Sequence, residues 1–123
     1  MTTFGTRIRP FVDAELQAAR LAGGRGDAHA SFSHLERAHV LGQASTFQHV
    51  RVHFLMLRWA VRQRSAKEAV GQLMRIIGAA TKTAAGWVPE GNTGGANVSP
   101  FRSMAIPPDV DAVIRSARAR HNQ

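Results

Sequence analysis

The stretch that decides the fold is DAHASFSHLERAHVLGQASTFQHVRVHFLMLRWAVRQR, residues 27–64. Asp27 and, further on, Ser45 or Thr46 are suitable N-cap residues for two successive helices, because their side-chain oxygens can accept from free backbone amides. Gly42 is placed to close the first of them. The turn between the helices is short, at about residues 42–46, so the two are expected to pack antiparallel.

Similar signals for the start and end of a helix occur on both sides of this stretch. Pro10 suits the first position of an earlier helix that ends at Gly23-Gly24. Ser65 and Glu68 form a capping-box pattern for a fourth helix. Pro107-Pro108-Asp109 opens a last helix with apolar residues on one face. The predicted helices cover about residues 10–22, 28–41, 46–64, 66–80 and 109–121.

No segment alternates apolar and polar residues as a strand does, so the sequence predicts an all-α fold. We expect a single helical domain over residues 1–123, since this length leaves no room for a second core. Two antiparallel helical hairpins would occupy residues 10–80. A long glycine- and proline-rich loop would follow at 81–108, and a C-terminal helix at 109–121.

A faint internal repeat relates residues 20–42 to residues 58–80. Aligned pairs are Ala22 with Ala60, Leu35 with Leu73, Arg37 with Arg75, and the capping residues Asp27 with Ser65. Paired helices with small residues at the crossings resemble tetratricopeptide hairpins, and a plain helical bundle fits nearly as well. Two hairpins are fewer than the three that usually close a solenoid core, so the last helix and the long loop are expected to cover the exposed end.

Composition narrows the function classes. Apolar residues make up 44% of the chain, which argues against disorder, and the absence of cysteine excludes disulfides and thiolate chemistry. The longest apolar run, residues 54–57, is too short to span a membrane, and the N-terminus lacks a signal-peptide core, so we expect a cytoplasmic protein. The net charge of +8 raises nucleic-acid binding, but the arginines are scattered and no tyrosine is present, which disfavours it.

The histidines are the most informative residues. At 100° per residue, His49 and His53 lie one turn apart on the core-facing side of their helix, opposite its arginines Arg51, Arg58 and Arg62. His39 lies on the core-facing side of the preceding helix and should come level with His49 across the turn. His34 lies at an edge of that helix, and His29 points toward solvent.

Two carboxylates are candidates to join this group. Glu36 lies one turn before His39 at the edge of the same face, and Glu15 lies within the apolar stripe of the first helix. Burying a lone glutamate costs several kcal/mol unless its charge is paired. The histidines, or a metal bound by them, are the nearest candidates to pair with Glu15. The sequence therefore predicts a site of His39, His49 and His53 with Glu36 or Glu15 that binds one divalent ion such as Zn²⁺ or Fe²⁺.

Alternatives remain beside the metal site. Neutral histidines hydrogen-bonded to Glu15, Glu36 and Gln43 would serve only as a polar staple between helices, leaving a tetratricopeptide-like module that binds a protein partner. No nucleophile motif accompanies the histidines, so no catalytic residue is proposed.

The long loop carries a second candidate site. Gly91-Asn92-Thr93-Gly94-Gly95 can form a nest of backbone amides that binds an anion, although it lacks the ending of a phosphate-binding loop. The alternative is a packed Ω-loop anchored by Trp87 and Phe101.

Four runs of sequence resemble a known family. They are His34–Gln43 (HLERAHVLGQ), His49–His53 (HVRVH), Gly91–Gly95 (GNTGG) and Met104–Pro108 (MAIPP). Together they are similar to a family of small bacterial proteins catalogued as domain of unknown function 3703. The resemblance implies a bacterial source and a helical fold, and it implies no activity.

Overall fold

In a computed structural model, the described chain forms five helices. They are α1 (Phe4–Gly24), α2 (Ala28–Gly42), α3 (Thr46–Arg62), α4 (Ala66–Ala84) and α5 (Pro108–Ala119). The structure describes residues 2–84, 89–99 and 102–119, with the backbone alone for 82–84, and no strand occurs within these ranges. The prediction of an all-α fold is confirmed.

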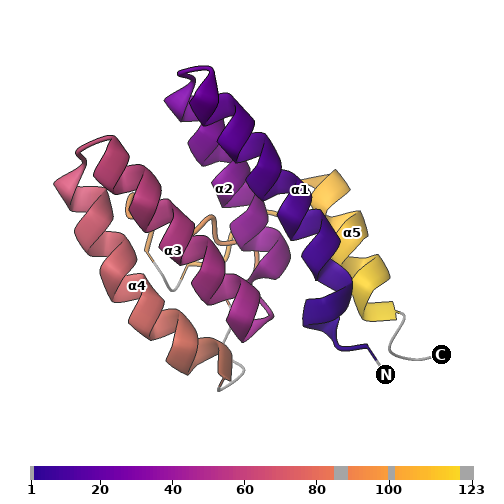
Figure 1. The fold of residues 1–123 in the computed structure, drawn as a ribbon. Helices are drawn as coiled ribbons and strands as arrows, with labels where there is room; N and C mark the ends of the chain where they lie inside the picture. The colour runs from indigo at the N-terminus through magenta and orange to yellow at the C-terminus, as the bar shows by residue number, and fades with distance from the viewer. Residues whose placement is uncertain (1, 85–88, 100–101, 120–123) are drawn as a thin grey trace.

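The helices pair as two hairpins, α1 with α2 and α3 with α4 (Figure 1). α2 and α3 are the inner contact between the hairpins, and α5 packs on α1 and α2, on the side away from α4. The loop that joins α4 to α5 passes behind α2 and α3 in this view. Two hairpins, a long loop and a C-terminal helix therefore stand in the predicted order.

The predicted caps hold the helix starts. The Asp27 side chain accepts from the Ala30 amide at 3.0 Å, and the Ser65 hydroxyl accepts from the Glu68 amide at 3.4 Å. Ser45 caps α3 in the same way. The two residues aligned by the internal repeat, Asp27 and Ser65, thus do the same task at the start of the second helix of each hairpin.

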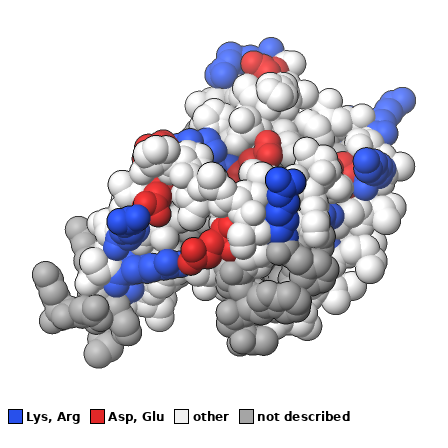
Figure 2. Space-filling view, turned by 180° about the vertical axis from the view of Figure 1, so that it is seen from behind, with Lys and Arg blue, Asp and Glu red and all other residues white. Residues whose placement is uncertain are grey.

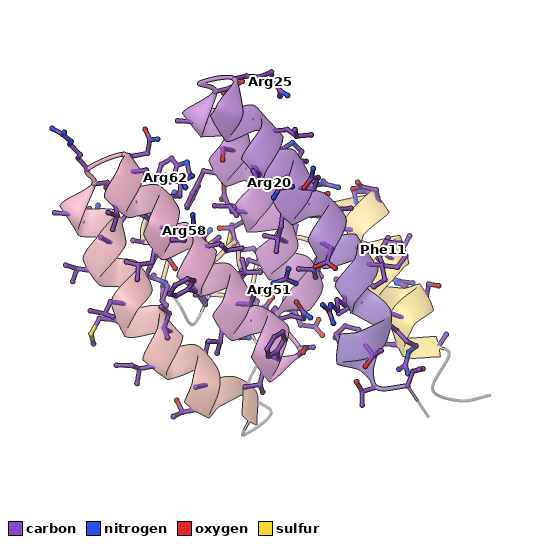
Figure 3. The ribbon with its side chains drawn as sticks, viewed as in Figure 1. Phe11, Arg20, Arg25, Arg51, Arg58 and Arg62 are labelled. Atoms are coloured by element: carbon purple, nitrogen blue, oxygen red, sulfur yellow. The ribbon has the colours of Figure 1, made fainter. Side chains whose placement is uncertain are left out.

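The first helix begins earlier than predicted. Thr3, rather than the residue before Pro10, caps α1, and Pro10 lies inside the helix. Ile8 and Val12 on either side of it are completely buried, so packing of the stripe outweighs the hydrogen bond that proline cannot donate. Phe11, between these two buried residues in the sequence, is 46% exposed (Figure 3).

The other boundaries shift by a few residues. α4 runs to Ala84 rather than to about 80, and α5 starts at Pro108. The predicted end of α5 at 121 lies outside the described residues. None of the helices, as far as they are described, is long and apolar enough to cross a membrane.

The core is built around α2. Its C-terminal half, residues 38–43, is buried at every position, because α1, α3, α5 and the long loop surround it. The core side chains are Ile8, Val12, Ala19, Leu35, Ala38, Val40, Leu41, Val52, Met56, Val110, Ile114 and Ala117. A polar residue on this half of α2 therefore lies in a dry interior.

Most charged side chains lie outside this core; Arg75 of α4, whose Nε is buried, is an exception and lines the cavity beside the core histidines. On the face seen from behind, acidic and basic residues are interspersed, so the positive net charge forms no continuous patch there (Figure 2).

Candidate metal centre

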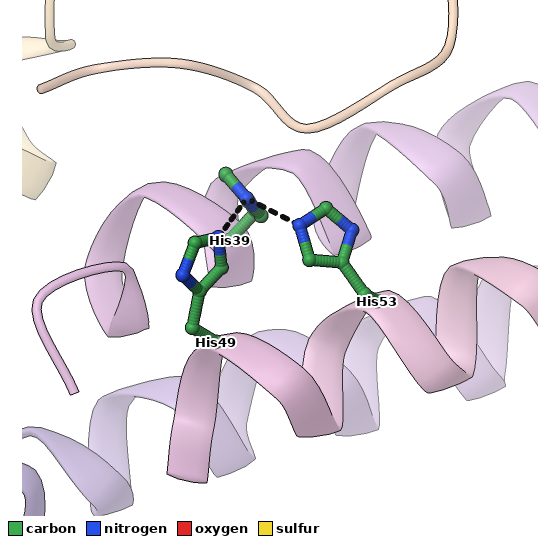
Figure 4. A group of neighbouring side chains, drawn as sticks. All are labelled: His39, His49 and His53. Atoms are coloured by element: carbon green, nitrogen blue, oxygen red, sulfur yellow. Dashed lines mark hydrogen bonds between the residues drawn. The ribbon is translucent and has the colours of Figure 1, made fainter. Parts of the chain in front are cut away.

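Three imidazoles meet between the hairpins. His39 of α2 and His49 and His53 of α3 are 2%, 5% and 2% exposed. The Nε2 atom of His39 lies 3.0 Å from Nε2 of His49 and 3.1 Å from Nε2 of His53 (Figure 4). The three residues each offer a ligand atom within 4.8 Å of the others, so the predicted convergence of the three imidazoles is confirmed.

The helices explain why these rings converge. His49 and His53 are one turn apart on α3, so both project from the same side. The short turn before α3 brings His39 level with them from α2. The ring centroids lie 4.6 to 4.9 Å from one another, with the His39 ring nearly perpendicular to the other two.

The outer nitrogens of two rings are held by carbonyl oxygens. His39 Nδ1 lies 2.5 Å from the backbone oxygen of Asn92, and His53 Nδ1 lies 2.6 Å from Oε1 of Gln72. The Gln72 amide nitrogen donates to Glu68 and to the Gly94 oxygen, at 2.7 and 2.8 Å, which fixes its oxygen toward His53. Because a carbonyl oxygen only accepts, both Nδ1 atoms carry the proton.

The inner nitrogens are therefore left without protons in neutral rings. Nε2 of His39 and Nε2 of His53 both present lone pairs, yet they lie only 3.1 Å apart. Two acceptors at this distance repel unless a proton or a cation lies between them. The repulsion between Nε2 of His39 and Nε2 of His53 is present whichever nitrogen of His49 carries its proton.

A proton is a poor solution for His39. Burial lowers the pKa of His39 well below its ordinary value, and the neighbouring His53 and His49 lower it further. The imidazolium is disfavoured because it would be charged in a dry interior beside two other bases. A bound metal ion accepts the lone pairs without this difficulty.

A loop packs over the His39 side of the site. In this covering loop, residues 89–99, Asn92 is the anchor: its amide nitrogen donates to the Ser99 and Arg102 oxygens, and its Oδ1 accepts from Gly94. Gly94 has φ +84°, and a Cβ there would meet Cδ2 of His39 at 2.5 Å. Only glycine fits so close to the ring.

The space left among these groups is small. The cavity has a volume of about 10 Å³ and is lined by the three histidines together with Gln43, Arg75, Ala79, Pro89, Asn92 and Gly94. One water-sized sphere needs about this volume, so a single ion or water fits and an organic substrate does not.

The structure does not bring the predicted carboxylates to this group. The Glu15 carboxylate pairs with His34 at 2.7 Å and with Arg37 at 2.9 Å, and not with the core histidines. Glu36 is half buried; burial raises its pKa, which a hydrogen bond from the Thr93 side chain partly offsets. The expectation that Glu15 pairs with the core histidines is therefore wrong, because Glu15 forms a nearer ion pair on the α1–α2 surface.

Two backbone amides of the Gly91–Gly95 segment have acceptors within the same loop. The amides of Asn92 and Gly94 donate to the Pro89 oxygen and to Asn92 Oδ1. Just beyond the segment, the Ala96 amide donates to the Glu68 carboxylate at 3.0 Å. Trp87 and Phe101, the proposed loop anchors, lie outside the described residues, and no anion tests the predicted nest.

Sequence reasoning missed the outer residues of the site. Gln72 is completely buried and lies two helical turns before the buried Ala79, so a polar residue in a buried stripe was the available sign. Asn92 and Gly94 were noticed, but for an anion rather than for the histidines. Their role depends on how the loop folds back, which local sequence does not specify.

The comparisons with known proteins agree with the resemblance given by the sequence runs. No curated protein and no solved structure matches the chain at a significant level, so the likeness to tetratricopeptide hairpins rests on paired helices alone. One family profile, described as protein of unknown function (DUF3703), matches residues 6–114. The match spans all of α2, α3 and α4, including the three core histidines, and the chain belongs to this family.

Proposed function

We propose that the protein binds one divalent transition-metal ion through Nε2 of His39, His49 and His53. The observation that carries this proposal is the approach of two unprotonated nitrogens, on His39 and His53, to 3.1 Å in a buried site. Outer hydrogen bonds from metal-ligating histidines to carbonyl oxygens are the usual way to fix the tautomer that leaves the inner nitrogen free.

The distances favour an ion with imidazole ligands. With metal–nitrogen bonds of about 2.0–2.1 Å, two ligands lie about 3.3 Å apart at tetrahedral angles and about 2.9 Å apart at right angles. The observed 3.0 and 3.1 Å fall between these values. Zn²⁺ and Fe²⁺ both suit such ligands, and a three-histidine set leaves at least one position for water.

Binding, rather than catalysis, is the proposed role. The cavity holds about one water-sized sphere, and the covering loop closes it over His39. The ion would tie α2 to α3 and, through Asn92 and Gln72, to the loop and α4. Metal binding would then stabilise the contact between the hairpins.

Elemental analysis of protein purified without a histidine tag tests the proposal. We expect about one equivalent of metal per chain in the wild type, and loss of that metal in His49→Ala and His53→Ala. His34→Ala is the matched control, because its imidazole is bound to Glu15 on the surface. A metal-free wild type whose thermal stability ignores both added Zn²⁺ and chelator would leave the histidines as a structural cluster.

A further inference from the structure

A groove separates the two hairpins on the side away from the metal centre. It lies between α1 and α3, has a volume of about 740 Å³, and is lined by both helices and by the start of α2. None of the three core histidines lines it. This volume is in the range of sites that bind organic ligands or peptide segments.

Arginines surround this groove. Arg20 of α1 and Arg51, Arg58 and Arg62 of α3 line it, whereas Asp13 is its one acidic lining residue (Figure 3). They line the front of the molecule in Figure 3, whereas charges on the opposite face are interspersed (Figure 2). The groove is therefore a local concentration of the chain's positive charge.

Two of these arginines have no counter-ion among the residues that the structure describes. Arg51 is bound to Asp13 at 2.6 Å, and Arg20 donates to Gln17. Within the described part of the chain, Arg58 and Arg62 make neither a hydrogen bond nor an ion pair. Both are exposed, so their guanidinium groups are available to an anionic partner.

The floor of the groove is apolar and rigid. It is formed by Leu16, Ala19, Leu35, Leu55 and Trp59. The Trp59 ring packs on Phe32 with centroids 4.5 Å apart, and its Nε1 donates to the Ala28 oxygen at 3.1 Å. A ligand would meet a preformed apolar surface below a positively charged rim.

The spacing of the arginines indicates the length of the ligand. Arg51 and Arg62 are separated by about 16 Å along α3 at 1.5 Å per residue. A single carboxylate or phosphate reaches only one end of this row. About five residues of extended peptide, or three turns of a helix, cover the whole row.

From this charge and shape we propose that the groove binds an acidic peptide segment whose apolar side chains rest on the Leu16–Leu55–Trp59 floor. A nucleic acid fits less well, because the Trp59 ring is already packed on Phe32 and the aliphatic side chains of the floor offer nucleobases no aromatic surface to stack on. This site is independent of the metal proposal.

A selection experiment tests the peptide site without a known partner. A random library of twelve-residue peptides displayed on phage is selected on the wild-type protein, and the enriched peptides are measured by fluorescence anisotropy. We expect a consensus that combines Asp or Glu with Leu, Ile, Phe or Trp. Affinity should fall at least about tenfold in Arg58→Glu/Arg62→Glu, since two charge-assisted contacts become repulsive.

The control changes the same charge elsewhere. Arg115→Glu/Arg118→Glu alters two exposed arginines of α5 by the same net charge and should keep the affinity. Circular dichroism checks that both variants fold, and Arg58→Gln/Arg62→Gln should give an intermediate loss. Lack of an acidic–apolar consensus, or equal binding to the Arg58→Glu/Arg62→Glu variant, would overturn the proposal. So would binding of an oligothymidylate probe, but of no peptide, that depends on Arg58 and Arg62.

Discussion

Within the described residues, histidines take part in two polar clusters, one on the surface and one in the core, and these are built in opposite ways. On the α1–α2 surface, His34 and Arg37 share the Glu15 carboxylate, and Arg37 also binds Asp109 of α5, holding the pKa of Asp109 below its usual value. Every base there faces an acid. In the core, His39, His49 and His53 face one another, and among the described residues no acid belongs to the group.

The two clusters differ in whether their own side chains balance one another's charge. The surface cluster is electrically complete and partly hydrated, so it needs nothing further and contributes modestly to stability. The core cluster brings three imidazoles together in a dry site. The hydrogen bonds made by Nδ1 of His39 and of His53 leave a lone pair, rather than a proton, on each Nε2. The proposed metal ion would supply the positive charge that this cluster of lone pairs can bind.

The largest effect should be the response to metal. Added Zn²⁺ at about 100 times its Kd should stabilise the wild type by about 2.7 kcal/mol, or about 10 °C in Tm. His53→Ala should abolish the shift, and His34→Ala should keep it, as measured by calorimetry of chelator-treated protein. Equal shifts in the two variants would remove the distinction between the clusters.

The close approach of the loop should matter next. Gly94→Ala places a Cβ within 2.5 Å of the His39 ring at φ +84°, so we expect a loss of about 2–3 kcal/mol in the free energy of unfolding, with weakened metal binding. Gly24→Ala is the control, because no atom lies within 4 Å of its Cβ and its stability should stay the same or rise slightly. Urea denaturation measures both, and an undisturbed Gly94→Ala would show that the loop does not press on the ring.

The outer shell should have a smaller effect, on affinity. Gln72→Met removes the acceptor that holds His53 Nδ1 and should weaken Zn²⁺ binding about 10- to 100-fold in competition with a coloured chelator. Gln43→Met is the comparison, since Gln43 is also buried but donates to the Pro89 oxygen, whereas Gln72 accepts from a histidine. If both variants lost affinity equally, orientation of His53 would not be the cause.

The smallest effect should come from the surface cluster. Glu15→Gln leaves His34 and Arg37 with a neutral partner, and all three side chains are partly in contact with water. We expect a loss of at most about 1 kcal/mol in urea denaturation and unchanged Zn²⁺ affinity. A loss of metal in this variant would mean that Glu15 reaches the core site after all.

The sequence predicted the helices and the meeting of the three histidines because both follow from local periodicity and a short turn. The positions of His39 and His49 on either side of the α2–α3 turn define their relative level before any tertiary contact is known. The start of α1 was missed because burial of Ile8 and Val12, which is tertiary, outweighs the propensity of Pro10.

The residues around the ligands could not be predicted in the same way. Gln72 reaches His53 from a helix in the second hairpin, and Asn92 reaches His39 from a loop far along the chain. The misplacement of Glu15 has a similar cause, since its real partners, His34 and Arg37, lie on the flank of α2 rather than in the core. Helical period identifies a face, but it does not identify which neighbour that face will meet.

Gly94 packed over His39 also has a kinetic consequence. An ion held as proposed would have to pass the covering loop, so its exchange would be slower than free diffusion allows. Residence times would then be long and independent of the chelator chosen. The proposed site would therefore suit retention of an ion rather than its rapid transfer to another molecule.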